Sequence, residues 1–194
     1  MDSPINALFG QSHPLTTILA IQAANHLLSP EFEYSVYVPG PPGTTLERTI
    51  NTIPGKDIED TWLKEVIESL DENEEVAWHS RVYVNGEIYH IPMIDFSVQF
   101  IAREEILPRI DDVKAILYNS GRSIHAYYPT LLTDEKWHKF LGQVLLLNPS
   151  GSDTGHIVDC RWIGHSLEHG FSALRWTQNT SRYLTIPSLI ECVA

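Results

Sequence analysis

The spacing of apolar positions changes several times along the chain and predicts helices and strands in alternation. Residues 15–28 carry a broad apolar face that ends at Ser29-Pro30, which is typical of a helix and its stop signal. After Pro54-Gly55, apolar residues recur at every fourth position, which marks one face of a helix. Helices are expected over 15–28, in a short segment opening at 44–47, and over 58–70, 99–106, 133–145 and 161–169.

The centre of the chain changes to the two-residue period of strands. The runs 76–84 and 88–91 flank Asn85-Gly86, which is the strongest short signal for a β-hairpin. Further strands are expected over 34–38, 92–98, 113–118, 126–128, 156–159, 172–177 and 183–186. Together these elements predict an α+β fold with a mostly antiparallel central sheet and flanking helices.

The composition is that of an ordinary soluble domain. The chain has 194 residues, of which 43% are hydrophobic and 20% charged, enough for one domain with a buried core. Its two cysteines indicate neither a disulfide framework nor a cysteine-based zinc site. The apolar runs are shorter than a membrane span, and the first residues lack the pattern of a signal peptide. We therefore expect a cytoplasmic protein with no membrane partner.

The charge of the chain bears on nucleic-acid binding. A formal net charge of −12 speaks against a broad, non-specific grip on a nucleic-acid backbone. The last third of the chain nevertheless holds Arg161, Arg175 and Arg182, so a local basic cleft on an acidic body stays open. Arg161 and Arg182 taken singly are expected to form surface salt bridges.

The most informative segment is the turn at 120–125, which joins the apolar runs 113–118 and 126–128. Its Ser120-Gly121 pair marks a tight turn whose free backbone amides can point at one spot. Arg122 and His125 add charge and hydrogen-bond donors near that spot. This combination suits a bound phosphate group, and an ordinary hairpin with a polar tip is the alternative.

Two aspartates stand in apolar surroundings. Asp95 lies within an apolar strand, and Asp159 ends the apolar run 157–158. A carboxylate in such a place is costly unless it is paired or binds a metal, and two of them on neighbouring strands could hold Mg²⁺ or Mn²⁺. A helix cap or a salt bridge is the alternative for each, above all for Asp159, because a helix is expected to begin directly after it.

The order of these motifs resembles the catalytic core of the archaeo-eukaryotic primase superfamily, from about residue 76 to 187. Asp95 lies where that family has its first metal-binding motif, and Ser123-Ile124-His125 matches the small-x-His motif that contacts the phosphates of the incoming nucleotide. The third motif is matched by 157–159, and the strand that carries Arg175 is similar to 173–177. The resemblance implies a two-lobed primase-polymerase-like core. We expect one domain over 1–194, with an N-terminal lobe of helices and strand at 1–75 and the primase-like lobe that carries the motifs at 76–194.

The activity that the resemblance implies is template-directed nucleotidyl transfer. Asp95 and Asp159 would be the catalytic residues and would hold Mg²⁺ or Mn²⁺ against the α-phosphate. The residues implied to bind the nucleotide are Ser120, Arg122, Ser123, His125 and Arg175. The implied partners are a nucleoside triphosphate, a DNA or RNA template, and a subunit or domain that supplies the template grip which an acidic surface lacks.

One departure from the family pattern bears on catalysis. The first motif of the family is usually Asp-x-Asp, whereas this chain has Asp95-Phe96-Ser97. Alternation along a strand places Ser97 where the second aspartate would be, which suggests a divergent branch that keeps one aspartate there. A serine oxygen is a weak and neutral ligand, and two-metal catalysis wants several carboxylates. A nucleotide-binding or assembly module with reduced catalysis is therefore the alternative function.

Two weaker functional signals are a histidine motif and a tryptophan. His165 and His169 flank Glu168 on an expected helix, so a zinc hydrolase is a third functional class, although histidines near a helix end are common without a metal. Trp176 is the tryptophan most suited to stacking on a base.

Overall fold

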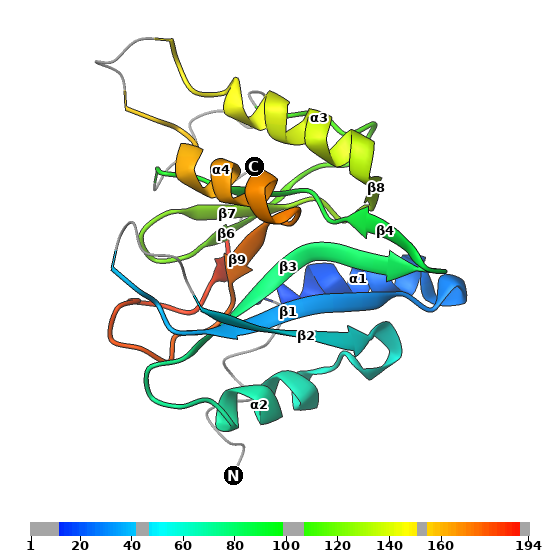
Figure 1. Cartoon of the computed structure of the whole chain (residues 1–194), viewed down its shortest axis with the longest axis vertical. Helices are drawn as coiled ribbons and strands as arrows, with labels where there is room; N and C mark the ends of the chain where they lie inside the picture. Colours follow the sequence, from blue (N-terminus) through cyan, green and yellow to red (C-terminus); the bar gives the residue numbers. More distant parts are fainter. Residues whose placement is uncertain (1–11, 42–46, 99–106, 151–154, 191–194) are drawn as a thin grey trace.

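The computed structural model describes residues 12–41, 47–98, 107–150 and 155–190 and has an α+β fold (Figure 1). Its helices are α1 (Leu15–Ala24), α2 (Asp60–Glu68), α3 (Asp134–Leu145) and α4 (Cys160–His169), with 3-10 turns at His26–Leu28 and Gly55–Asp57. Its strands are β1 (Glu31–Tyr37), β2 (Arg48–Pro54), β3 (Glu75–Val84), β4 (Glu87–His90), β5 (Met93–Asp95), β6 (Ile116–Asn119), β7 (Ile124–Tyr127), β8 (Leu132–Thr133), β9 (Ala173–Arg175) and β10 (Ser188–Leu189). The expected α+β class with antiparallel pairing is confirmed.

The larger sheet is built around the long strand β3. Its strand order is β2-β1-β3-β4-β8, and β9 also pairs with β3. All of these pairs are antiparallel, with β1 along one edge of β3 and with β4 and β9 sharing the other. Asn85 and Gly86 join β3 to β4 with φ angles of 52° and 82°, the left-handed values of a tight hairpin turn, so the hairpin predicted there is confirmed.

The smaller sheet has the order β10-β6-β7-β5, again antiparallel. Side chains alternate across it, because Met93 belongs to one hydrophobic core and the next residue, Ile94, to another. Asp95 follows Met93 by two residues and pairs with His125 on β7. Both polar residues therefore share the face of this sheet that is turned toward the first core.

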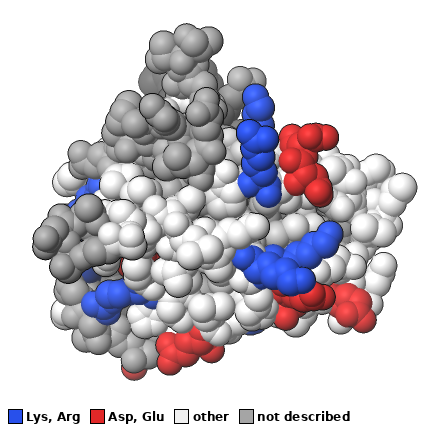
Figure 2. All heavy atoms as spheres, turned by 90° about the horizontal axis from the view of Figure 1, so that it is seen from above, with Lys and Arg blue, Asp and Glu red and all other residues white. Residues whose placement is uncertain are grey.

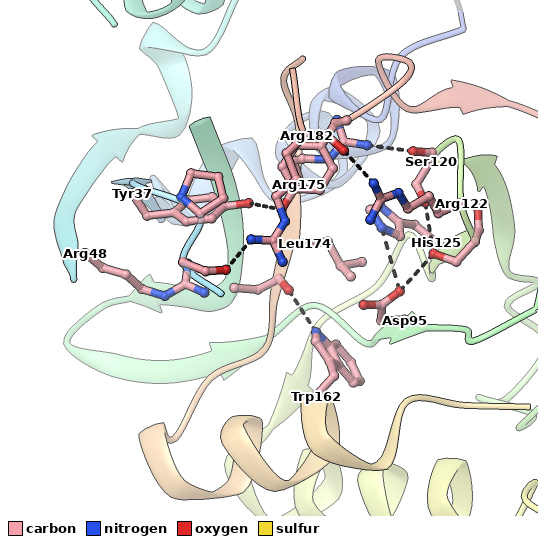
Figure 3. Close-up of a pocket in the computed structure, with 15 residues that line it drawn as sticks. Tyr37, Arg48, Asp95, Ser120, Arg122, His125, Trp162, Leu174, Arg175 and Arg182 are labelled. Carbon is pink, nitrogen blue, oxygen red and sulfur yellow. Dashed lines mark hydrogen bonds and ion pairs between the residues drawn. The ribbon is translucent and has the colours of Figure 1, made fainter. Parts of the chain in front are cut away.

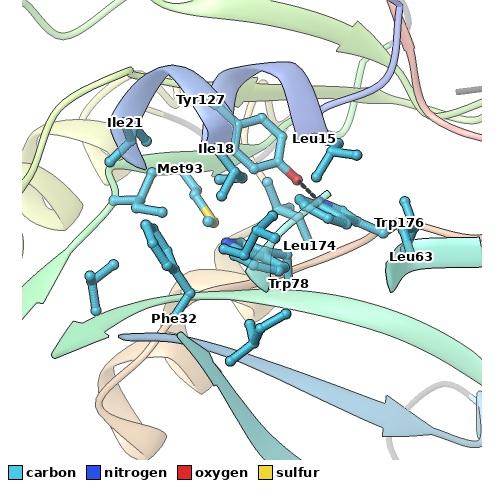
Figure 4. Packing of buried hydrophobic residues seen from close by; sticks show 14 of the residues in the cluster. Leu15, Ile18, Ile21, Phe32, Leu63, Trp78, Met93, Tyr127, Leu174 and Trp176 are labelled. Atoms are coloured by element: carbon cyan, nitrogen blue, oxygen red, sulfur yellow. Dashed lines mark hydrogen bonds between the residues drawn. The ribbon is translucent and has the colours of Figure 1, made fainter. Parts of the chain in front are cut away.

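The first core is formed by the two sheets together with helices α1 and α2, and it is centred on stacked indole rings (Figure 4). Trp78 on β3 and Trp176 after β9 lie with ring centroids 4.3 Å apart, and both are fully buried. The indole Nε1 of Trp176 donates to the hydroxyl of Tyr127 on β7, at 3.0 Å. Trp176 is thus a packing residue that joins the two sheets, and the expectation that it stacks on a base is wrong.

The second core fills the other face of the smaller sheet. Helices α3 and α4 cover that face, on the side away from β1 and β2 (Figure 1). Their buried side chains are Trp137, Phe140, Leu141, Val144 and Ile163. The smaller sheet is therefore held between helices on one face and the larger sheet on the other, which fixes the ends of β5, β6 and β7.

Three expected elements differ in the structure. The strand expected over 156–159 is reduced to an isolated bridge between Val158 and Phe96. In place of a helix opening at 44–47, the chain forms strand β2 from Arg48, since β2 pairs with β1 along its whole length; residues 42–46 lie outside the described part. Segment 183–186 is not a strand, because the side chains of Gln178 and Arg175 bind the carbonyls that a ladder would use. The expected helix at 99–106 lies outside the described residues.

Within the described part of the chain, no helix combines the length and apolarity that a membrane crossing needs.

Candidate functional site

The turn between β6 and β7 is closed by its own hydrogen bonds. Ser120 donates from its backbone amide and from its hydroxyl to the carbonyl of Ser123, both at 3.0 Å. The amide of Gly121 donates to the side-chain oxygen of Asn119 at 2.8 Å. These two amides are therefore engaged in hydrogen bonds, whereas the sequence predicted that they would be free. Gly121 has a φ of +95°, and a Cβ there would lie 2.8 Å from Oγ1 of Thr185, so the turn needs a glycine.

Asp95 ends β5 beside this turn. Its Oδ1 accepts a hydrogen bond from the hydroxyl of Ser123 at 3.3 Å. The imidazole Nε2 of His125, which pairs with Asp95 in the ladder, lies 3.8 Å from the same oxygen. The side chain of Asp95 is 26% exposed and that of His125 only 6%. The pairing of β5 with β7 thus places Asp95, from the first predicted motif, beside His125, from the second.

Burial shifts both of these groups toward their neutral forms. Loss of hydration and the nearby charge of Asp159 raise the pKa of Asp95 to about 7, against the opposing hydrogen bond from Ser123. Burial and the charge of Arg175 lower the pKa of His125 to about 3. His125 is therefore a neutral imidazole, and its Nδ1 is buried without a hydrogen-bond partner among the described residues.

Asp159 lies next to Asp95 and also caps a helix. Its amide donates to the carbonyl oxygen of Asp95 at 3.1 Å, beside the bridge between Phe96 and Val158. Its Oδ1 accepts from the amides of Arg161 and Trp162, at 2.8 and 3.2 Å, which is the geometry of an N-cap on α4. The helix cap expected for Asp159 is therefore found, and it uses only Oδ1 of the two carboxylate oxygens.

A pocket of about 280 Å³ opens beside these groups, between the ends of the two sheets (Figure 3). It is lined by six of the seven site residues that the sequence predicts, namely Asp95, Ser120, Arg122, Ser123, His125 and Arg175. Asp159 is not among the lining residues. The rest of the lining consists of Tyr37, Pro39, Gly40, Arg48, Trp162, Ala173, Leu174, Arg182 and Tyr183. Asp95 is the one carboxylate in this lining, against four arginines.

Arg175 binds the parts of the pocket together. Its guanidinium donates to the carbonyls of Ser120 at 2.6 Å and Thr185 at 3.1 Å, and also to that of Thr177. Its carbon Cζ lies 4.1 Å from the ring centroid of Tyr183. Arg175 is 7% exposed, and burial lowers its pKa. Its charge reaches the pocket, while most of its hydrogen bonds hold the turn against the C-terminal segment.

The arginines of the pocket donate to neutral acceptors. Arg122 donates to the carbonyl of Arg182 at 2.9 Å, and Arg182 donates to that of Gly40. Among the described residues none of the four forms a salt bridge with a carboxylate, so the salt bridge expected for Arg182 is not found. On the face of the molecule shown in Figure 2, by contrast with the pocket, basic and acidic side chains lie next to one another. The pocket is therefore a concentration of uncompensated positive charge on an acidic protein.

Several lining residues were not predicted from the sequence. Tyr37 and Arg48 belong to β1 and β2, and Trp162 to α4, where its Nε1 donates to the carbonyl of Ala173 at 2.8 Å. Their presence depends on how the two sheets meet, and no local motif signals it. Among these lining residues, Arg182 had a usable signal in the sequence, because it lies close to Arg175 in the last third of the chain, where a basic cleft stayed open.

Ser97 does not occupy the position that strand alternation predicted. Strand β5 ends at Asp95, and Ser97 lies beyond it in a bend, with its amide donating to the carbonyl of Ile157 at 2.8 Å. Ser97 is exposed and is not among the lining residues. Extrapolating the strand past Asp95 was therefore wrong.

The histidine motif forms a separate cluster on α4. The possible ligand atoms of His165, Glu168 and His169 lie within 4.8 Å of one another, and all three side chains are exposed. None of them lines the pocket. These three groups lie close enough together to be a possible donor set, and the metal content of the purified protein tests the zinc hydrolase alternative.

The comparisons with known proteins agree with the arrangement of the motifs. Searches among curated proteins and among solved structures gave no match. The model of an AEP-like family, described as archaeo-eukaryotic primase 1D-like, matches residues 54–188, which is more than two thirds of the chain. The matched stretch contains all seven predicted site residues. The expected relation to the primase superfamily is therefore confirmed, and the chain belongs to the archaeo-eukaryotic primase 1D-like family.

Proposed function

We propose that the pocket binds a nucleoside triphosphate with one divalent cation, Mg²⁺ or Mn²⁺, and that the protein carries out template-directed nucleotidyl transfer. The observation that carries this proposal is the composition of the pocket. Its one carboxylate, Asp95, lies at one side, and guanidinium groups without carboxylate partners line the rest (Figure 3). A triphosphate is the common ligand that needs both a cation at its α-phosphate and several basic groups along its tail.

The aspartates fit a single hard cation. Carboxylate oxygens are the ligands that Mg²⁺ and Mn²⁺ prefer. Burial and the charge of Asp159 disfavour the ionised form of Asp95, and a bound cation would offset both effects. When bound, the cation would polarise the α-phosphate toward attack by a 3′-hydroxyl, with pyrophosphate as the leaving group. We assign the chain to a branch that keeps one aspartate in its first metal motif, because Ser97 lies outside the pocket.

The remaining residues bind and orient the nucleotide in this proposal. His125 is neutral and offers one N–H donor beside Asp95. Arg122 and the hydroxyl of Ser123 stand at the turn and reach phosphate oxygens, while Arg175 keeps the turn in place through the carbonyl of Ser120. The net charge of −12 favours a partner subunit or domain that holds the DNA or RNA template.

A catalytically reduced nucleotide-binding module is the second candidate, and one observation favours it. Oδ1 of Asp159 is already used to cap α4, so the two aspartates have fewer oxygens to offer than two unengaged carboxylates. Two-metal catalysis is therefore not expected in this pocket, and transfer would depend on a single cation.

Two measurements on the same protein test the proposal. Binding of ATP is measured by calorimetry with and without Mn²⁺, and primer extension is measured on a short template. Asp95→Asn should lose the Mn²⁺-dependent part of ATP binding and all extension, whereas Asp112→Asn, an exposed control, should lose neither. Binding without extension in the wild-type protein would favour the module. Absence of ATP binding at millimolar concentration would overturn both candidates.

A further inference from the structure

The strands that precede the family-matched stretch complete the pocket from the side opposite Asp95. Tyr37 ends β1 and Arg48 begins β2, and the two residues pair in the ladder. Cζ of Arg48 lies 4.8 Å from the ring centroid of Tyr37. Figure 3 shows Arg48 at one end of the pocket and Asp95 toward the other, with Arg175 between them. Both Tyr37 and Arg48 lie outside residues 54–188.

A buried chain of hydrogen bonds ends on Arg48. Oε1 of Glu33 lies 2.6 Å from Nδ1 of His79, and Nε2 of His79 lies 2.9 Å from Oγ of Ser35. Nη1 of Arg48 then donates to the same Oγ at 3.2 Å. Glu33, His79 and Ser35 are each at most 2% exposed. The chain therefore runs across one face of the larger sheet, from β3 to β1, and ends at the pocket.

The chemistry of the four groups gives this chain one direction. A carboxylate only accepts, so Nδ1 of His79 carries the proton toward Glu33. Burial lowers the pKa of His79, so its Nε2 is an unprotonated acceptor for the hydroxyl hydrogen of Ser35. A lone pair of the Ser35 oxygen is then left for Arg48. Each member has its partner, which is the condition under which a buried polar network fixes one geometry.

The order serine, histidine, glutamate is also that of a hydrolytic triad, but Ser35 cannot act as a nucleophile. Its exposure is 0%, and its oxygen already accepts from Arg48. Glu33 is further held by Arg81 at 3.3 Å and by the hydroxyl of Tyr83 at 2.9 Å. The network is thus anchored at Glu33, and it positions Arg48 at its other end.

Arg48 itself is poorly compensated. It is half-buried, burial lowers its pKa, and it forms no salt bridge with a carboxylate among the described residues. One of its N–H groups is used by Ser35, so others stay available to a ligand. A partly desolvated guanidinium held rigidly at the wall of a pocket is well suited to an incoming oxyanion.

We propose that Arg48 forms an anion subsite for the terminal phosphate of the bound triphosphate, and that Ser35, His79 and Glu33 are its positioning residues. The subsite rests on the proposed function and adds to it a selection for triphosphates over diphosphates. The α-phosphate lies at the Asp95 side, so the end of the tail points to the Arg48 side. A nucleoside diphosphate lacks the phosphate that makes this contact in the proposal.

The test compares ATP and ADP binding in wild-type protein and variants by calorimetry with Mn²⁺. Arg48→Gln should weaken ATP binding about tenfold or more and leave ADP within about twofold, because one charge-assisted contact is lost. Arg109→Gln removes an exposed arginine outside the pocket and should change neither affinity. Ser35→Ala should reproduce part of the loss for ATP, and Ser35→Thr, which keeps the hydroxyl, should restore it.

The outcomes separate this inference from the function on which it rests. If the wild-type protein binds ATP and Arg48→Gln keeps the same ATP-to-ADP preference, the subsite is overturned and the pocket assignment stands. If Arg48→Gln weakens only a single-stranded oligonucleotide, the arginine serves the template and not the tail, and the subsite is again overturned. If the wild-type protein binds no ATP, both fail. Should Arg48→Gln not fold, Ser35→Ala takes its place, and an unchanged ATP-to-ADP preference in that variant would overturn the subsite with its positioning network.

Discussion

The backbone amide of Asp159 donates a hydrogen bond to the carbonyl oxygen of Asp95 at 3.1 Å. This one bond joins two motifs that are far apart in the sequence. Loss of hydration makes Asp95 hard to ionise, and this bond adds to the effect by holding the carboxylate of Asp159 nearby. The protein thus keeps like charges together, at a cost to its own stability, which is a common property of sites built for a ligand.

Asp95→Asn should stabilise the ligand-free protein at alkaline pH. The folded state raises the pKa of Asp95 from 3.8 to about 7, so the wild-type protein loses stability as the pH rises through that interval. Asparagine keeps an oxygen for the hydroxyl of Ser123 and carries no charge. We expect a gain of roughly 2 kcal/mol in the free energy of unfolding at pH 8 and almost none at pH 4, measured by urea denaturation.

The control for this prediction is Asp112→Asn, which changes the same charge at an exposed position. It should leave the difference between pH 4 and pH 8 as it is in the wild-type protein. An Asp95→Asn protein that is equally or less stable than the wild type at pH 8 would show that the carboxylate is not strained.

Affinity for Mn²⁺ should depend on pH through the same group. Below a pKa of about 7 the cation must displace a proton from Asp95. The apparent affinity should therefore rise by up to about tenfold per pH unit between pH 5 and pH 7 and level off above. Calorimetry in two buffers of different ionisation enthalpy measures the released proton directly. A flat profile with no proton release would place Mn²⁺ elsewhere.

The elements of this fold that sequence periodicity predicted are those in which local signals and tertiary contacts agree. The turn at Asn85-Gly86 and the helix that Gly170 ends have left-handed residues where the sequence places them. Strand β2 was missed because pairing with β1 overrides a local capping signal. Likewise β5 ends at Asp95, because the next residue, Phe96, forms an isolated bridge with Val158 while its amide still donates to the carbonyl of Ile124 on β7.

The residues of the candidate site likewise divide into those that a local motif predicts and those that only the tertiary structure brings together. The turn at 120–125 and Asp95 could be predicted because each carries its polar residues on a short local motif. Arg48 and Tyr37 could not, because they reach the pocket only when the two sheets meet. For Asp159 the sequence left a helix cap and a metal ligand as alternatives; the structure shows the cap and places the residue next to Asp95.

Substitutions at Asp159 should separate its two roles. Asp159→Asn keeps an oxygen for the amides of Arg161 and Trp162 and removes the charge, whereas Asp159→Ala removes both. We expect Asp159→Ala to lower the free energy of unfolding by about 1 kcal/mol and Asp159→Asn to change it by only a few tenths. Both should weaken Mn²⁺ binding, measured by calorimetry at pH 8. Wild-type Mn²⁺ affinity in Asp159→Asn would reduce this residue to a helix cap.

Gly121→Ala should have two effects: strain in the backbone conformation and a clash that disturbs the pocket. Its φ of +95° disfavours any side chain, and its Cβ would lie 2.8 Å from Oγ1 of Thr185. Gly86→Ala is the matched control, because Gly86 has a φ of +82° and nothing within 4 Å of its Cβ position. We expect Gly121→Ala to lower the free energy of unfolding by about 1 kcal/mol more than Gly86→Ala does, measured by urea denaturation.

The excess should come from contact with Thr185 and should carry over to ligand binding. Arg175 donates to the carbonyls of both Ser120 and Thr185, so pushing the turn away from Thr185 breaks the link that shapes the pocket. ATP affinity should therefore fall in Gly121→Ala and stay unchanged in Gly86→Ala. Adding Thr185→Ala to Gly121→Ala should return both the stability and the affinity toward the level of Gly86→Ala. Equal effects of the two glycine substitutions would show that the turn is only a hairpin with a polar tip.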